Sequence, residues 1–359
     1  MPEPDAPRPS SPQPSPLAPL RLNLALQGGG SHGALTWGVL DALLEDGRWH
    51  FDGVSGTSAG AMNAVALAHG FAQATLEHKD PHDAHRAGCE RARETLTRLW
   101  EGVGTLGSLL RGTPLSVANP LMGVMRQWLS PYQTNPLDIN PLRRLLEREV
   151  DFELLCNQRR AITAAGGPKV FVCATNVRTG RGEIFSGPRL SADAVMASAC
   201  LPLLFKAVEI EGQHYWDGGY SGNPALHPLI YQTETSDILL VQINPIEHLE
   251  LPHSGPEIME RMNEVTFNAS LLAEMRAIEF VRRLLAEGKL DPRRYKSVRM
   301  HRIDGGSVLA PFGADSKLRA DLAFVRKLFA LGRTAGQEWL QAHRKDVGVR
   351  PTIKITDNA

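Results

Sequence analysis

The chain has 359 residues, enough for one large or two small domains with a substantial core. Its 39 basic and 39 acidic side chains leave no net charge, which argues against binding to DNA or RNA. No apolar run approaches the roughly 18 residues that span a bilayer, and the four cysteines form no C-x-x-C pair, which argues against an integral membrane protein, a disulfide framework and structural zinc.

The first segment, residues 1–20, contains eight prolines among Ser, Asp, Glu and Gln. This composition buries too little apolar surface to order itself. It also lacks the basic and apolar regions of a secretion signal. We therefore expect a disordered tail on a cytoplasmic protein.

Two strand–loop–helix units follow the tail. The pattern of apolar residues predicts, in chain order, a strand at 20–26, a glycine-rich loop at 28–33, a helix from 34 to a stop at 46–47, a strand at 52–55, a tight turn at 56–60 and a buried helix at 61–72.

Residues 78–150 alternate between helical and proline-broken stretches. They are unusually apolar between 100 and 129, so we expect an inserted helical cap over the first unit.

The second half of the chain returns to strands and then to helices. Strands are predicted at 169–176, 183–186, 205–210 and 238–243, followed by a long amphipathic helix over 258–285 and a final helix over 315–342. Strands that alternate with helices favour an α/β fold of three layers, in which a mostly parallel central sheet has helices on both faces. We expect one domain over 21–245, with 246–359 as a helical extension packed on it.

The clearest chemical signal is a G-x-S-x-G motif, Gly56 to Gly60 with Ser58 at its centre. A nucleophilic serine of this type lies on a sharp, strained turn between a strand and a helix, so its neighbours must be small. The predicted strand and helix on either side provide that context. Ser58 is therefore the candidate nucleophile.

The glycine run Gly28, Gly29 and Gly30 also follows a strand and opens a helix. Bare backbone N–H groups there could bind the oxyanion of a tetrahedral intermediate. With Gly33, however, the run also matches G-x-G-x-x-G, a dinucleotide fingerprint. That fingerprint requires an acidic residue at the end of the second strand. In this sequence the acidic residue, Asp52, lies at the beginning of the predicted second strand.

A weakly nucleophilic hydroxyl needs a base, and Asp217, followed by Gly218 and Gly219, is the candidate. An ordinary Asp-Gly turn is the alternative interpretation of that tripeptide. A Ser58, Asp217, His227 triad would also fit a known order of catalytic residues, although His227 lies in what resembles a short structural helix.

Histidines and aspartates between residues 78 and 85 are of metal-ligand type. This segment is polar and broken by proline, so we expect a solvated loop and neither a metal nor another cofactor.

Together the three glycine-containing segments resemble the patatin-like phospholipases, whose pattern is G-G-G-x-[RK]-G, G-x-S-x-G and D-G-[GA]. Residues 197–202 also match the family's A-S-x-x-x-P stretch, and the resemblance covers roughly residues 20–245. It implies a Ser58–Asp217 dyad without histidine and an oxyanion hole of glycine amides. One position departs: His32 stands where the family has Arg or Lys, so it would supply a positive charge only when protonated.

The resemblance implies a serine acyl hydrolase that cleaves acyl esters of lipids through an acyl-enzyme. It implies an acyl lipid or another apolar ester as partner, with peripheral contact to a membrane or lipid surface, and no nucleic acid. Two alternatives stay open. One is an intracellular polyhydroxyalkanoate depolymerase, and the other is a nucleotide- or phosphate-binding protein that uses the glycine loop.

Overall fold

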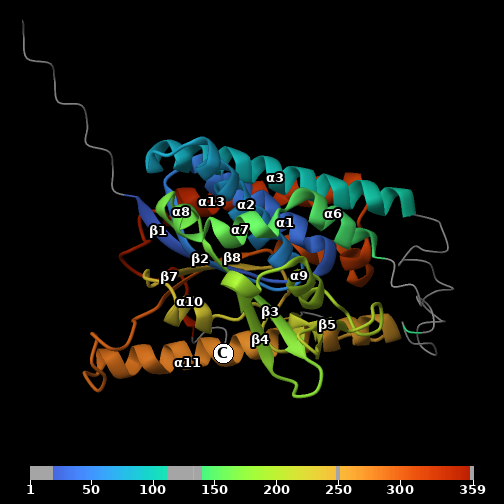
Figure 1. Ribbon diagram of the computed structural model, residues 1–359. Coiled ribbons are helices and arrows are strands. Elements are labelled where there is room, and N and C mark those ends of the chain that lie inside the picture. The colour runs from blue at the N-terminus through green and yellow to red at the C-terminus, as the bar shows by residue number, and fades with distance from the viewer. Residues whose placement is uncertain (1–18, 111–131, 133–139, 248–250, 356–359) are drawn as a thin grey trace, which may run out of the picture.

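A central sheet organises the computed structural model, which describes residues 19–110, 132, 140–247 and 251–355 (Figure 1). The strands are β1 Leu20–Leu26, β2 Trp49–Gly56, β3 Lys169–Asn176, β4 Gly182–Ser186, β5 Val208–Ile210, β6 Gln213–Asp217, β7 Asp237–Gln242 and β8 Arg299–Asp304. Their order is β5-β6-β3-β2-β1-β7-β8, and β4 pairs with β3 beside this path. The stretch from β3 to β8 is parallel, whereas β4, β6 and β5 join it antiparallel.

Helices cover both faces of this sheet (Figure 1). The longer ones are α1 Gly33–Asp46, α2 Ala59–Glu77, α3 Pro81–Leu110, α6 Pro141–Glu149, α11 Gly255–Ala286 and α13 Leu322–His343. The shorter ones are α7 Phe152–Asn157, α8 Arg159–Ala164, α9 Ala192–Ser198, α10 His227–Tyr231 and α12 Gly306–Leu309. The 3-10 turns are η1 Gly30–His32, η2 Gly187–Arg189, η3 Gly218–Tyr220, η4 Ala310–Phe312 and η5 Ala314–Leu318. In Figure 1, α1, α2, α3 and α13 lie on one face and α10 and α11 on the other.

The alternation of side chains along the strands builds a separate core on each face. On β7, Leu239 and Val241 belong to the core beneath α1, α2 and α13. Ile238 and Leu240 belong to the smaller core beneath α10 and α11. Both faces of β7 are buried, as expected of a central parallel strand. The predicted three-layer α/β class is confirmed.

Several predicted boundaries agree with the structure. Strand β1 has the predicted limits, and α1 ends at Gly47, whose φ of 69° is typical of a helix C-terminus. Residues 1–18 of the predicted tail and residues 111–131 and 133–139 of the predicted 78–150 cap lie outside the described residues. The described part of the 78–150 region includes α3, which is packed against α2 and α1 and buries Trp100 in the main core.

The C-terminal extension differs from the prediction in three ways. It is not wholly helical, because β8 adds a parallel strand to β7. The last helix starts at Leu322 rather than at 315, because the Asp321 carboxylate accepts the Phe324 amide and caps it there. Only the second half of α11 packs on the sheet, through Leu271, Met275 and Ile278.

Several apolar side chains in the first half of α11 are exposed to solvent. Ile258, Met262 and Val265 are 44%, 59% and 53% exposed. Among the described residues, no helix combines the length and the apolar character needed to cross a membrane.

Candidate active site

The predicted nucleophile lies on a strained turn between β2 and α2. Ser58 has φ 54°, a left-handed conformation that is rare outside glycine. Its N–H donates to Ser198 Oγ at 2.9 Å, which ties the turn to α9. A Cβ on Gly60 would come 2.1 Å from the Leu26 carbonyl oxygen, and one on Gly56 would come 2.3 Å from the Gly60 carbonyl oxygen. The motif glycines are therefore required by close backbone contact.

The glycine loop follows β1, the parallel neighbour of β2, so both loops open at the same edge of the sheet. Gly28 lies directly against the nucleophile: a Cβ built on it would come 2.7 Å from Ser58 Cβ. Its amide donates to Asn223 Oδ1 at 2.7 Å. Gly28 is therefore not a free oxyanion donor, contrary to prediction. The Gly29 and Gly30 amides donate to no group within the described part of the chain.

A network of buried amide side chains holds this loop, and sequence reasoning missed it. Gln27 accepts the backbone amides of Ile243 and Asn244, both at 2.9 Å. Asn244 Nδ2 in turn donates to the Gly28 carbonyl oxygen at 2.7 Å, and Asn223, which accepts the Gly28 amide, also donates to that oxygen at 3.3 Å. The glycine loop is thus held by the residues that follow β7 and by the segment before α10.

The predicted base, Asp217, ends β6 and is 1% exposed. Its Oδ1 accepts the Gly219 amide at 2.7 Å, while Oδ2 has no hydrogen-bond partner of ordinary geometry. Burial raises the pKa of Asp217 to about 7, and hydrogen bonding from the Gly219 amide and the Ser58 side chain opposes the rise. The Ser58 hydroxyl is therefore close enough to Asp217 to act on its pKa, although Oδ2 has no hydrogen bond of ordinary geometry.

The other motif glycines lie at contacts between elements. A Cβ on Gly33 would come 2.5 Å from Ala59 Cβ, where α1 meets the start of α2. A Cβ on Gly218 would come 2.0 Å from the Cys173 carbonyl oxygen of β3. Gly219 lies beneath Phe267 of α11.

His32 does not supply the expected positive charge. Its side chain is buried, and Nε2 lies 2.7 Å from Ser316 Oγ. Burial, with a smaller contribution from Lys317, lowers the pKa of His32 to about 3. The ring is neutral wherever Asp217 is ionised. Its role is to join the glycine loop to η5, where Ser31 Oγ also donates to the Ser316 carbonyl oxygen.

The triad is not formed. His227 is about half exposed, and its Nδ1 lies 3.8 Å from Glu274 of α11 instead of near Asp217. Asp52, the acid considered for a dinucleotide ribose, accepts the Thr235 amide at 2.7 Å away from the glycine loop. His227 is therefore not placed to act as the histidine of a triad, and Asp52 is not placed to bind the ribose of a dinucleotide at the glycine loop.

The histidine- and aspartate-rich segment is not the solvated loop that we expected, because α3 begins at Pro81 and His85 is buried. Asp80 Oδ1 accepts the amides of His82 and Asp83 and caps α3, although ligand atoms of these three residues lie within 4.8 Å of one another. His85 is buried between two backbone carbonyl oxygens, of Ala165 and Gly47.

Aromatic side chains pack beside the turn that follows Asp217. Tyr220, two residues beyond Gly218, packs edge-on against Phe267 of α11 with ring centroids 5.2 Å apart. The exposed apolar positions of α11 precede Phe267 on the same helix. An apolar surface of this kind suits a hydrophobic substrate.

The family model of the patatin-like phospholipases matches residues 24–230. Among solved structures, VipD from Legionella pneumophila is 15% identical, with a TM-score of 0.34 over 88% of this chain and 67% of that one. The human GIVD cytosolic phospholipase A2, solved with methyl gamma-linolenyl fluorophosphonate, is 13% identical, with a TM-score of 0.43 over 92% of this chain and 58% of that one. A search of curated proteins found no match.

Proposed function

Since the chain belongs to the patatin-like phospholipase family, we propose that it hydrolyses acyl esters of lipids through a dyad of Ser58 and Asp217. One observation carries the proposal. A strained serine, an uncommitted buried carboxylate oxygen and two free glycine amides meet at one edge of the sheet. These are the nucleophile, the base and the oxyanion donors of acyl transfer.

In the first half of the reaction, Asp217 Oδ2 takes the proton from Ser58 Oγ as the oxygen attacks the ester carbonyl carbon. The negative charge that develops on the carbonyl oxygen is stabilised by the Gly29 and Gly30 amides. The intermediate collapses, and the leaving alcohol takes the proton from Asp217. An acyl group then remains on Ser58.

In the second half, Asp217 removes a proton from water as the water oxygen attacks the acyl-enzyme carbonyl carbon. When the bond between the acyl carbon and Ser58 Oγ breaks, Asp217 returns that proton to Ser58 Oγ and the carboxylic acid leaves. Burial suits Asp217 to both steps, because its pKa of about 7 lets it accept and return a proton near neutral pH. Histidine is not needed. The exposed apolar side chains in the first half of α11, the helix whose Phe267 packs on Tyr220, favour an acyl lipid over a polar ester.

A fluorophosphonate probe tests the nucleophile. The probe is expected to label wild type on the peptide that contains Ser58 and to leave Ser58→Ala unlabelled. Ser297→Ala, an exposed serine outside the site, is the matched control and should label like wild type. Labelling that persists in Ser58→Ala, or that maps to another residue, would contradict the proposal.

A further inference from the structure

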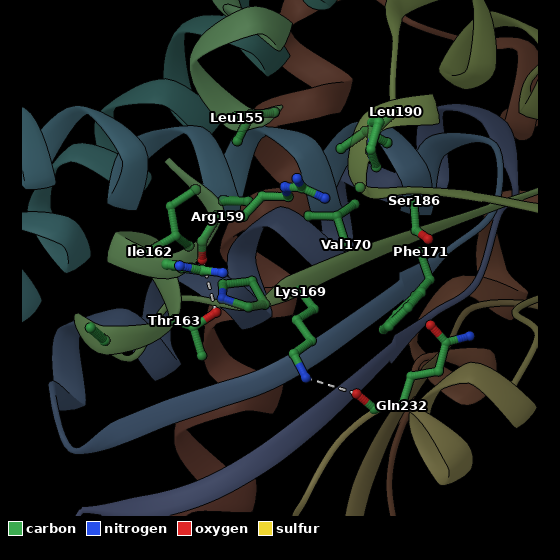
Figure 2. A pocket seen from close by; sticks show the side chains of 16 residues that line it. Leu155, Arg159, Ile162, Thr163, Lys169, Val170, Phe171, Ser186, Leu190 and Gln232 are labelled. Carbon is green, nitrogen blue, oxygen red and sulfur yellow. Dashed lines mark hydrogen bonds between the residues drawn. The ribbon is translucent and has the colours of Figure 1, made fainter. Parts of the chain in front are cut away.

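A cavity of about 830 Å³ lies apart from the dyad, at the amino end of β3 (Figure 2). Its walls come from α7, α8, the first residues of β3 and the segment from Ser186 to Leu190 that follows β4. Asp217 pairs with Ala174, five residues further along β3 than Lys169 at the cavity. The lining residue of β3 nearest to Ala174 is Phe171, three residues away, which at about 3.3 Å per residue is roughly 10 Å. Neither Ser58 nor Asp217 lines the cavity.

The inner surface of the cavity is apolar. Leu155 and Leu190 face it from one side, and Ile162, Val170 and Phe171 complete the lining (Figure 2). All five side chains are less than 10% exposed and belong to the cores of the domain. The cavity therefore has a rigid apolar surface that could hold an alkyl chain.

The rim carries positive charge without counter-ions. Arg159, Arg160 and Lys169 line the cavity, and no acidic side chain is among its described lining residues. Arg159 Nε donates to the Cys156 carbonyl oxygen and Lys169 Nζ to that of Gln232, both at 2.9 Å. None of the three cations forms an ion pair with a described residue.

The neighbouring Arg189 shows the contrast. It is paired with Glu183 at 2.7 Å and with Glu211 at 3.2 Å. Three uncompensated cations around one opening create a local positive potential, which attracts an anion. Guanidinium groups in particular match the geometry of carboxylate and phosphate.

We propose that this cavity binds an anionic amphiphile, with a carboxylate or phosphate head between Arg159, Arg160 and Lys169 and a single alkyl chain against the apolar surface. The volume lies within the roughly 300–1,000 Å³ of small-molecule sites. Thr163, Ser186 and Gln232 add polar atoms at the lining. The inference rests on the cavity alone and does not depend on the proposed hydrolysis.

The test is calorimetric titration of the full chain with dodecanoate and dodecyl phosphate below their micelle concentrations. Inorganic phosphate tests the anionic head without an alkyl chain, and a neutral dodecyl glycoside tests the alkyl chain without a charge. The two charged amphiphiles separate a fatty acid from a lipid phosphate as the natural source. At least one of them is expected to bind, while both single-feature probes bind at least about tenfold more weakly.

Variants place the binding in this cavity. R159Q/R160Q and, separately, K169Q should each weaken binding by about tenfold or more, since each variant removes a charge-assisted hydrogen bond to the anionic head. R159K/R160K keeps the charge and should restore part of the affinity. Arg178→Gln, an exposed arginine with no ion pair to a described residue, is the control and should bind like wild type.

Three results would overturn the proposal. The first is that neither charged amphiphile binds. The second is unchanged affinity in both R159Q/R160Q and K169Q, which would place the ligand elsewhere. The third is equal binding of the neutral glycoside or of inorganic phosphate, which would show that one half of the site is not used. Ester turnover in these variants is read separately, so failure of the hydrolase proposal is distinguishable.

Discussion

Asp217→Asn is expected to stabilise the fold, because the wild-type carboxylate is held where its charge is unfavourable. Burial raises the pKa of Asp217 from 3.8 to about 7. The folded protein therefore holds this proton more tightly than the unfolded chain does. Stability from this group is complete below about pH 4 and is lost as the pH rises through about 7.

The magnitude follows from the shift. About three pKa units at 1.36 kcal/mol each give a loss of at most about 4 kcal/mol above pH 7. Only about 2 kcal/mol of this is lost at pH 5.5. Asparagine carries no charge at any of these pH values, and its Oδ1 can still accept the Gly219 amide. Asp217→Asn should therefore gain more stability over wild type at pH 8.5 than at pH 5.5.

Chemical denaturation of both proteins at pH 5.5 and pH 8.5 measures the effect. We expect the difference in unfolding free energy between variant and wild type to grow by about 2 kcal/mol between the two pH values. Asp291→Asn changes an exposed aspartate that also accepts a backbone amide, and it should show no such change. A pH-independent difference for Asp217→Asn would refute the account of its burial.

Three further changes test the surroundings of the dyad. His32→Arg would bury a cation beside a lone hydroxyl, so we expect the melting temperature to fall by the equivalent of about 3 kcal/mol or more, and an unchanged value would show that the position reaches solvent. Asn223→Ala removes the acceptor of a glycine-loop amide and should cost about 1–3 kcal/mol and lower ester turnover about tenfold, whereas wild-type turnover would remove it from the support of the loop. Gly60→Ala places a methyl group 2.1 Å from a carbonyl oxygen and should prevent folding or lower the melting temperature sharply. Gly255→Ala is the control, because its methyl group meets no atom within 4 Å, and equal melting temperatures for the two variants would contradict the tight turn.

Local patterns were enough to predict the parts of the site that depend on spacing along the chain. Ser58 was identifiable because its motif lies between a predicted strand and a predicted helix, and a sharp turn there needs small neighbours. Asp217 was not identifiable alone, since Asp-Gly is common in turns. Only the order of several motifs singled it out.

The supporting network was beyond sequence reasoning, because its partners are far apart in the chain. Asn223 and Asn244 reach Gly28 across 195 and 216 residues, and no local pattern marks either asparagine. Only the Asn223 contact occupies the Gly28 amide, since Asn244 binds the Gly28 carbonyl oxygen. The candidate oxyanion donors could therefore not be narrowed to Gly29 and Gly30 in advance.

Charge states were also beyond sequence reasoning. The ordinary pKa of histidine led to the expectation of a titrating His32, but burial lowers that pKa and keeps the ring neutral. Burial acts in the opposite direction on Asp217 and raises its pKa.

Strand β8 was not predicted, because its charged and polar residues weaken the apolar pattern of a strand. In the structure, Arg299 and His301 of β8 form hydrogen bonds with Asp237 of the adjacent strand.

The most direct test of the Ser58–Asp217 dyad is the pH dependence of kcat/KM for a water-soluble short-chain ester, measured for wild type and Asp217→Asn. We expect the wild-type profile to rise through an acid limb with its inflection near pH 7, where Asp217 ionises. Asp217→Asn should be lower by about 100-fold or more and should lack that inflection, because an amide cannot accept the serine proton. Near wild-type turnover in Asp217→Asn, with the inflection intact, would contradict the assignment of Asp217 as the base.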